Sequence, residues 1–142
     1  FRFDSFPKYA SLSGTGKMNF FSDEQILQIH SSLITKTGGI DGIREYNLLD
    51  SSLKSIFQTF DGKELYPSIL DKAAQLCYAL IDNHPFLDGN KRIGVHLMLI
   101  FLKINGIDLN YSQEELIDFG LKIASGKMKK DEIKEWSGNH SK

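Results

Sequence analysis

The residues best suited to chemistry stand together in one short motif, His84–Arg92. The motif reads His-Pro-Phe-Leu-Asp-Gly-Asn-Lys-Arg, so a histidine, a carboxylate, a glycine, an amide and two cations follow one another closely. The most apolar stretch of the chain, Asn90–Asn105, begins inside it. If that stretch is a helix, the free N–H groups and the dipole at its N-terminus form an anion site. The motif therefore predicts a site for a phosphorylated ligand.

Several residues of the motif have side chains or backbones suited to such a site. Gly89 lets the backbone approach a phosphate closely. Lys91 and Arg92 bring positive charge to the first helical turn, where cations oppose the dipole unless an anion is bound between them. Asp88 is suited to Mg²⁺, which takes one or two carboxylates together with phosphate oxygens and water. His84, in the preceding loop, is the candidate general base for a hydroxyl.

The elements that must position this motif are predicted to be helices. Apolar residues recur at helical spacing, and Ser22 with Gln25 and Ser112 with Glu115 form capping boxes. The predicted helices are Asp23–Lys36, Asn47–Thr59, Ile69–Asp82, Asn90–Asn105, one from Ser112 to Ser125-Gly126, and Asp131–Trp136. The helix over 90–105 is apolar almost all round, which is typical of a buried central helix. Strand alternation is missing except for a short extended piece at Gly106–Tyr111, so the predicted fold is all-α.

The motif resembles the signature of the Fic/Doc family. That signature is H-P-F-x-D/E-G-N-G-R in the Fic branch and H-x-F-x-D-A-N-K-R in the Doc, or death-on-curing, branch. Two further stretches are similar to the Doc branch, namely the glycine-rich loop Gly38–Arg44 and the helix end Phe101–Gly106. The resemblance covers roughly Met18 to Trp136. It implies a compact Fic/Doc-type helical domain built around the helix at about 90–105.

The resemblance also implies roles for the motif residues. His84 would deprotonate the target hydroxyl, Asp88 would bind Mg²⁺, and Phe86 would anchor the loop in the core. The phosphates of the nucleotide would be held by three residues: Gly89, Asn90 and Arg92. Arg92 would in addition neutralise charge in the transition state.

Three positions bear on which part of the nucleotide is transferred. Lys91 stands where AMP-transferring Fic enzymes have glycine, and it should crowd the usual phosphate position and pair with a phosphate itself. In Doc-like proteins such a lysine goes with a reversed nucleotide, whose γ-phosphate faces the acceptor. Val95 replaces an additional phosphate-binding arginine of the AMP transferases, whereas Gly89 matches them. The resemblance therefore implies an ATP-dependent protein Ser/Thr kinase of Doc type, with AMP transfer (protein adenylylation) as the alternative and an inactive binding module as a further one.

The partners implied by the resemblance are proteins. Elongation factor Tu is the expected target, so that the chain would inhibit translation as a toxin. Many Fic enzymes carry an inhibitory helix with a Ser/Thr-x-x-x-Glu-Gly/Asn pattern. This pattern is not found here, so a separate antitoxin is expected instead.

The composition favours a cytoplasmic protein that binds neither membrane nor nucleic acid directly. Lys and Arg number 17 against 18 Asp and Glu, so the overall charge lacks the basic excess typical of nucleic-acid binding. No uninterrupted apolar run reaches transmembrane length. The single cysteine, Cys77, fits a reducing compartment and is expected to be an inert core residue.

Four polar residues outside the motif are also assigned. His30 is placed on the polar side of the first helix and His140 in a frayed tail, both without a role. His96 is interpreted as a core or groove histidine rather than a catalytic one. Arg44 either braces the glycine-rich loop or is simply exposed.

The first 17 residues differ from the rest of the sequence, and we assign the Fic/Doc domain to residues 18–142. Ser13-Gly14-Thr15-Gly16 is typical of a flexible linker. Residues 1–17 are therefore predicted to be either a tag, a linker or an appended peptide, or equally a natural N-terminal extension. Their aromatic residues are expected to pack into an apolar groove, either an antitoxin groove or one on a neighbouring molecule in a crystal: Phe1, Phe3 and Phe6.

Overall fold

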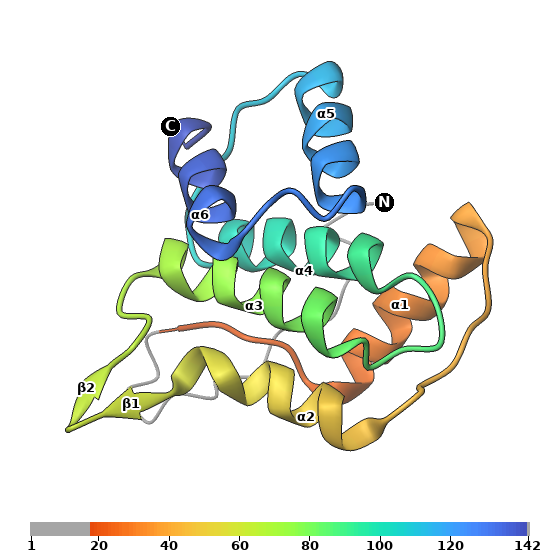
Figure 1. Ribbon diagram of the computed structural model, residues 1–142, viewed down its shortest axis with the longest axis horizontal. Coiled ribbons are helices and arrows are strands. Elements are labelled where there is room, and N and C mark those ends of the chain that lie inside the picture. Colours follow the sequence, from red (N-terminus) through yellow and green to blue (C-terminus); the bar gives the residue numbers. More distant parts are fainter. Residues whose placement is uncertain (1–17, 142) are drawn as a thin grey trace.

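The computed structural model describes residues 18–141, and these form a helical domain, as the sequence predicted (Figure 1). The helices are α1 (Asp23–Thr37), α2 (Tyr46–Lys54), α3 (Ile69–Asn83), α4 (Asn90–Ile104), α5 (Gln113–Ala124) and α6 (Lys130–Asn139), with one 3-10 turn, η2 (Ser55–Phe57). The predictions for residues 1–17, including the packing of Phe1, Phe3 and Phe6, lie outside the described residues.

Serine caps set where three of the helices begin. Ser22, Ser68 and Ser112 stand before α1, α3 and α5, and each closes a capping box. The Ser22 hydroxyl accepts a hydrogen bond from the Gln25 N–H at 3.2 Å, and the Ser22 N–H donates to the Gln25 side chain at 2.8 Å. Two of the three boxes were predicted, because the capping residues are neighbours in the sequence and need no tertiary contact.

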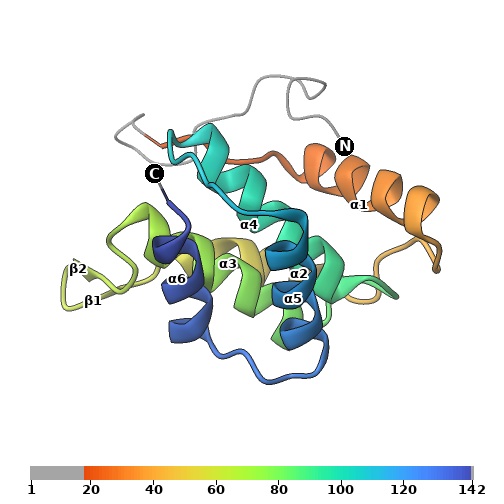
Figure 2. The same ribbon diagram turned by 90° about the horizontal axis from the view of Figure 1, so that it is seen from above.

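Helices α3 and α4 lie side by side in the middle of the fold (Figures 1 and 2). Helices α2 and α6 pack on α3, whereas α1 and α5 pack on α4. Gly94 permits the close approach of the central pair, since a Cβ there would lie 3.1 Å from the Cys77 carbonyl oxygen. The predicted burial of α4 is confirmed by its fully buried residues: Ile93, Leu97, Met98, Ile100, Phe101 and Leu102.

The chain before α1 is fastened to the far end of α4. Phe20 and Phe21 are buried in the core. The preceding residue, Asn19, forms two hydrogen bonds with the side chain of Asn105. The Asn19 backbone N–H donates to the side-chain oxygen, and the side-chain NH₂ donates to the Asn19 carbonyl oxygen, both at 2.9 Å. The described chain therefore enters the fold at the end of α4 opposite the motif.

The segment after α2 differs from the prediction. The helix expected to reach Thr59 ends at Lys54, and a small antiparallel hairpin follows, β1 (Thr59–Phe60) and β2 (Lys63–Glu64), with Thr59 opposite Glu64. Asp61 and Gly62 both have positive φ, 53° and 76°, which is the geometry that hairpin turns of two residues favour. Strands of two residues are too short to show alternation, so the sequence could not reveal them.

Two further elements differ in extent. The extended piece expected at Gly106–Tyr111 forms only an isolated bridge, between Leu109 and Ser141. Helix α6 runs past Trp136 to Asn139. The prediction that His140 lies in a frayed tail is wrong. Its ring stacks on Trp136, and its Nε2 lies 2.7 Å from a carboxylate oxygen of Glu115 on α5. These contacts join the chain end to α5, which helical periodicity alone did not indicate.

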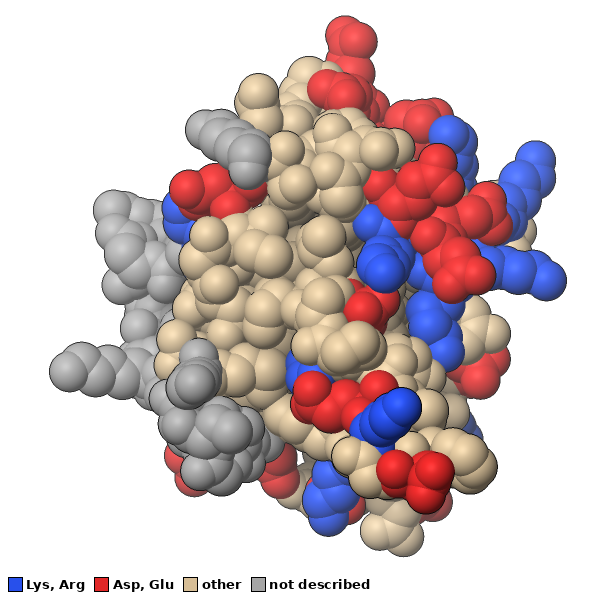
Figure 3. All heavy atoms as spheres, turned by 90° about the vertical axis from the view of Figure 1, so that its left-hand side faces the viewer, with Lys and Arg blue, Asp and Glu red and all other residues tan. Residues whose placement is uncertain are grey.

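On the face shown in Figure 3, basic and acidic side chains lie interspersed. In the part of the chain that the structure describes, every helix is too short or too polar to cross a bilayer.

Candidate active site

A pocket of about 400 Å³ opens at the N-terminus of α4. Leu87 of the motif loop and Ala124 at the end of α5 contribute to its wall. The other lining residues are the predicted ones: His84, Asp88, Gly89, Asn90, Lys91 and Arg92. Phe86, the remaining predicted residue, is buried beneath the pocket with 1% of its surface exposed.

His84 stands where α3 ends, and its backbone is in the left-handed conformation, with φ 50° and ψ 56°. This conformation is uncommon for a residue with a side chain and needs support from the surrounding structure. Arg44 supplies support, since its guanidinium donates to the carbonyl oxygens of His84, at 2.7 Å, and Asn83, at 2.9 Å. Arg44 thus joins the glycine-rich loop to the motif. The His84 imidazole is left exposed at the pocket, where a hydroxyl group can reach it.

The motif loop and the glycine-rich loop are hydrogen-bonded like two short strands. Ile43 and Phe86 form an isolated antiparallel bridge, and the Leu87 N–H donates to the Gly42 carbonyl at 3.0 Å. Asn90 fastens Phe86 from the other side, because its side chain accepts from the Phe86 N–H at 2.9 Å and donates to the Phe86 carbonyl at 3.0 Å. Since the Asn90 side chain is buried and engaged in this way, its backbone N–H is the group it can offer to a phosphate.

The backbone at the start of α4 has free donors. The N–H groups of Asn90, Lys91 and Arg92 donate to no acceptor among residues 18–141. Gly89 precedes them with φ 77°, and a Cβ at this position would lie 3.0 Å from the Ile34 side chain. Unpaired N–H groups and the helix dipole together attract an anion, so the start of α4 can bind phosphate.

Asp88 holds its carboxylate at the junction of the two loops. One oxygen accepts from the Ile40 N–H at 3.1 Å, and the other accepts from the Gly89 N–H at 2.8 Å. These two hydrogen bonds, the first above all, lower the pKa of Asp88, with the nearby Arg92 guanidinium adding to the effect. The carboxylate is therefore ionised and suited to a cation.

The fit of Asp88 to Mg²⁺ depends on ligands from outside the protein. Residues 18–141 contain no cluster of three or more His, Cys, Asp or Glu side chains that could bind a metal ion. A single carboxylate nevertheless fits Mg²⁺, because this ion commonly keeps several waters and binds phosphate oxygens of a nucleotide.

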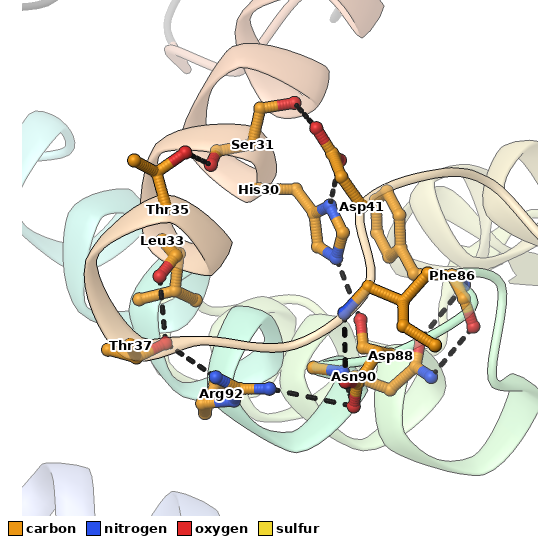
Figure 4. Close-up of polar contacts among 12 residues, drawn as sticks. His30, Ser31, Leu33, Thr35, Thr37, Asp41, Phe86, Asp88, Asn90 and Arg92 are labelled. Carbon is orange, nitrogen blue, oxygen red and sulfur yellow. Dashed lines mark hydrogen bonds and ion pairs between the residues drawn. The ribbon is translucent and has the colours of Figure 1, made fainter.

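The two cations of the motif point in different directions. Arg92 reaches back to the glycine-rich loop, donating to the Thr37 hydroxyl at 2.5 Å and the Gly38 carbonyl at 2.7 Å (Figure 4). Lys91 reaches the other wall of the pocket and donates to the Ala124 carbonyl at 2.7 Å. The pocket thus lies between two cationic side chains, with the free N–H groups between them.

A second groove adjoins the pocket between α4 and α5 and measures about 290 Å³. Lys91, Arg92 and Ala124 border both cavities. Val95 and His96 line this groove, and burial lowers the pKa of His96. The groove position of His96 agrees with its interpretation from the sequence.

The placement of His30 on the polar side of α1 is wrong. Its side chain is 1% exposed, it stacks on Phe86 with ring centroids 3.8 Å apart, and its Nε2 lies 2.8 Å from the Asp88 carbonyl oxygen. The signal was present in the sequence: His30 follows Ile26 by four residues and precedes Ile34 by four, so it belongs to the buried stripe.

Comparison with known proteins identifies the family of the chain. Residues 20–102 match the Fic/DOC family. Over 72 residues the chain is 42% identical to "Toxin Doc" of Mycolicibacterium smegmatis, an alignment that covers 51% of this chain and 55% of that protein. Over 111 residues it is 25% identical to "Protein kinase doc" of Escherichia phage P1, covering 78% of this chain and 86% of the phage protein. The chain therefore belongs to the Fic/DOC family, on the Doc branch.

Proposed function

We propose that this chain is a Doc-type toxin that acts as a protein Ser/Thr kinase, transferring the γ-phosphate of ATP to a hydroxyl group of a protein target. The observation that carries the proposal is the pocket at the start of α4, where free N–H groups, the Asp88 carboxylate and the His84 imidazole face one cavity. The two relatives bear the names "Toxin Doc" and "Protein kinase doc", which agree with the proposal.

In the proposed reaction the protein mainly positions and neutralises charge. The N–H groups at the start of α4 and the Arg92 guanidinium hold the phosphates. His84 takes the proton of the acceptor hydroxyl as its oxygen bonds to the γ-phosphorus. The bond from that phosphorus to the bridging oxygen breaks, and ADP leaves. Mg²⁺ held at Asp88 would neutralise phosphate charge when bound.

Lys91 and Val95 favour γ-phosphate transfer over AMP transfer. Lys91 occupies the pocket wall where a transferase has glycine, and Val95 lines an apolar groove where a transferase has a phosphate-binding arginine. Gly89 matches the transferases, but the left-handed backbone at this position, with φ 77°, also favours glycine. A Cβ at position 89 would meet Ile34 at 3.0 Å and the Arg92 guanidinium at 3.4 Å. Gly89 therefore carries little weight in favour of adenylylation.

The proposed target is elongation factor Tu, and the proposed consequence is inhibition of translation in the cytoplasm. A separate antitoxin would restrain the activity. The proposed target rests on the family resemblance, and the name "Toxin Doc" of the mycobacterial relative agrees with a toxin that an antitoxin restrains.

One experiment separates the candidate functions. The purified chain is incubated with elongation factor Tu, Mg²⁺ and ATP labelled on either the α- or the γ-phosphate, with the His84→Ala variant as control. Label from the γ-phosphate on the target supports the kinase, and label from the α-phosphate would establish adenylylation instead. If neither label appears although the target binds, the chain is a binding module.

A further inference from the structure

His30 lies directly behind the active-site loop, on a helix that begins far from the motif in the sequence. Its imidazole is parallel to the Phe86 ring, with an interplanar angle of 9° and a centroid distance of 3.8 Å. Figure 4 shows the ring between the glycine-rich loop and the motif loop, with polar contacts at both nitrogens. The side chain is 1% exposed, so water does not compete for these contacts.

The hydrogen of Nε2 can be assigned from its partner. Nε2 lies 2.8 Å from the carbonyl oxygen of Asp88. A carbonyl oxygen can only accept, so Nε2 carries a hydrogen and donates it. The other nitrogen, Nδ1, lies 3.3 Å from a carboxylate oxygen of Asp41. The Ser31 hydroxyl donates to the second Asp41 oxygen at 2.7 Å, which helps to hold this carboxylate against the ring.

The Asp88 carbonyl belongs to the peptide unit that also carries the Gly89 N–H, and this N–H donates to the Asp88 carboxylate at 2.8 Å. The orientation of this one peptide plane therefore sets both the position of the carboxylate and the left-handed turn at Gly89 that opens α4. Among the described residues, no other donor to the Asp88 carbonyl is found.

We infer that His30 is a positioning residue of the active site, which holds the Asp88–Gly89 peptide plane through its Nε2–H and supports Phe86 through ring stacking. It does so without touching the nucleotide or the acceptor. The inference rests on the proposed function, because it assigns His30 a role in orienting the groups proposed to hold Mg²⁺ and phosphate. Residues that orient metal ligands in this way typically contribute about 10- to 100-fold to metal affinity or activity.

Two substitutions separate the hydrogen bond from the stacking. His30→Phe keeps an aromatic ring against Phe86 and removes the donor to Asp88. His30→Gln removes the ring and keeps an amide donor that can reach the Asp88 carbonyl. The matched control is His140→Phe, since His140 is also a stacked histidine, on Trp136 with ring centroids 4.3 Å apart, and does not line the active-site pocket.

The kinetic readout is the Mg²⁺ concentration for half-maximal transfer, measured with kcat and with the KM for the protein target. For His30→Phe we expect about a 10- to 100-fold loss in kcat or in apparent Mg²⁺ affinity, with the target KM unchanged. His30→Gln should recover most of the loss, and His140→Phe should change neither value. Normal kcat and Mg²⁺ dependence in a folded His30→Phe protein would overturn the inference, as would equal losses in the Phe and Gln variants.

A second readout does not require activity. In the nucleotide-free wild-type protein, NMR of the ¹⁵N-labelled side chain should detect the hydrogen on Nε2 of His30. The amide resonances of Leu87 and Gly89 should shift or broaden in His30→Phe and not in His140→Phe. A wild-type ring without a hydrogen on Nε2 would refute the inference even if transfer is observed. If the wild-type protein transfers neither label, the proposed function fails, and these resonances still decide whether His30 orients the loop.

Discussion

Replacing Gly39 by alanine should disable the site while leaving the fold largely intact. Gly39 has φ 124°, and a Cβ built there would lie 2.5 Å from a carboxylate oxygen of Asp88 and 3.1 Å from the Arg92 guanidinium. The first distance is too short for any carbon–oxygen contact. An alanine must therefore displace the Asp88 carboxylate from its hydrogen bond with the Ile40 N–H.

Gly38→Ala is the matched control for this substitution. Gly38 also has a positive φ, 86°, but a Cβ there would meet nothing within 4 Å. Both alanines should cost about 1–3 kcal/mol of stability through backbone strain. The further contact at Gly39 is with the ends of two side chains that can swing away, so it adds little to the loss of stability. Because the Asp88 carboxylate leaves the position from which it would bind Mg²⁺, the rate of phosphate transfer should fall about 10- to 100-fold more in Gly39→Ala than in Gly38→Ala.

The assay pairs urea unfolding of both variants with Mg²⁺-dependent transfer from labelled ATP. We expect similar unfolding free energies and strongly different rates, with the Gly39→Ala deficit partly recovered at high Mg²⁺ concentration. Equal loss of activity in the two variants would mean that backbone strain, and not contact with Asp88, is responsible. Full activity of Gly39→Ala would refute the placement of the glycine-rich loop against the carboxylate.

Four further substitutions or conditions test other parts of the structure. His84→Ala should lower transfer by about 10²–10⁴-fold with little change in thermal stability, because the side chain is exposed; unchanged turnover would remove His84 from the mechanism. Arg92→Ala should weaken ATP binding in calorimetry, and Arg92→Lys should restore it only in part, since lysine cannot form a bidentate contact with phosphate. The pKa of His140 is raised, first by the hydrogen bond to the Trp136 carbonyl and then by the contact with Glu115. Protonated His140 should therefore stabilise the fold fully below the ordinary histidine pKa, and this stabilisation should be lost as pH rises through the raised pKa. Denaturant unfolding of wild type and His140→Ala across this range should show a stability difference that shrinks at high pH. Burial raises the pKa of the Cys77 thiol to about 12, so a thiol reagent should react with it only as fast as the protein unfolds; rapid labelling of the folded protein would contradict this.

The sequence by itself determined the helices, most of their ends and the family. Helix caps such as Ser22 with Gln25 act within one turn, so neighbouring residues suffice to predict them. The all-round apolar pattern of the segment that became α4 indicated its central position, because burial on every side requires apolar residues on every side. The motif places its chemical groups within one loop and one helical turn, so their proximity was also evident from the sequence.

Only the tertiary structure decided what holds these groups in place. His30 contacts the Asp88 carbonyl across 58 positions of the chain, and Arg44 contacts the His84 carbonyl across 40. The periodicity of α1 could place His30 on the buried face, but no local pattern names its partner on another element. His30 is buried and Asp88 is half-buried, so an unpaired donor or acceptor there is costly, and the packing of α1 against the start of α4 supplies the partner. Arg44 and His84 are exposed, and their contact depends on the pairing of the two loops. The sequence therefore shows which candidate groups the motif contains. The orientation of these groups depends on contacts that form only when the helices pack.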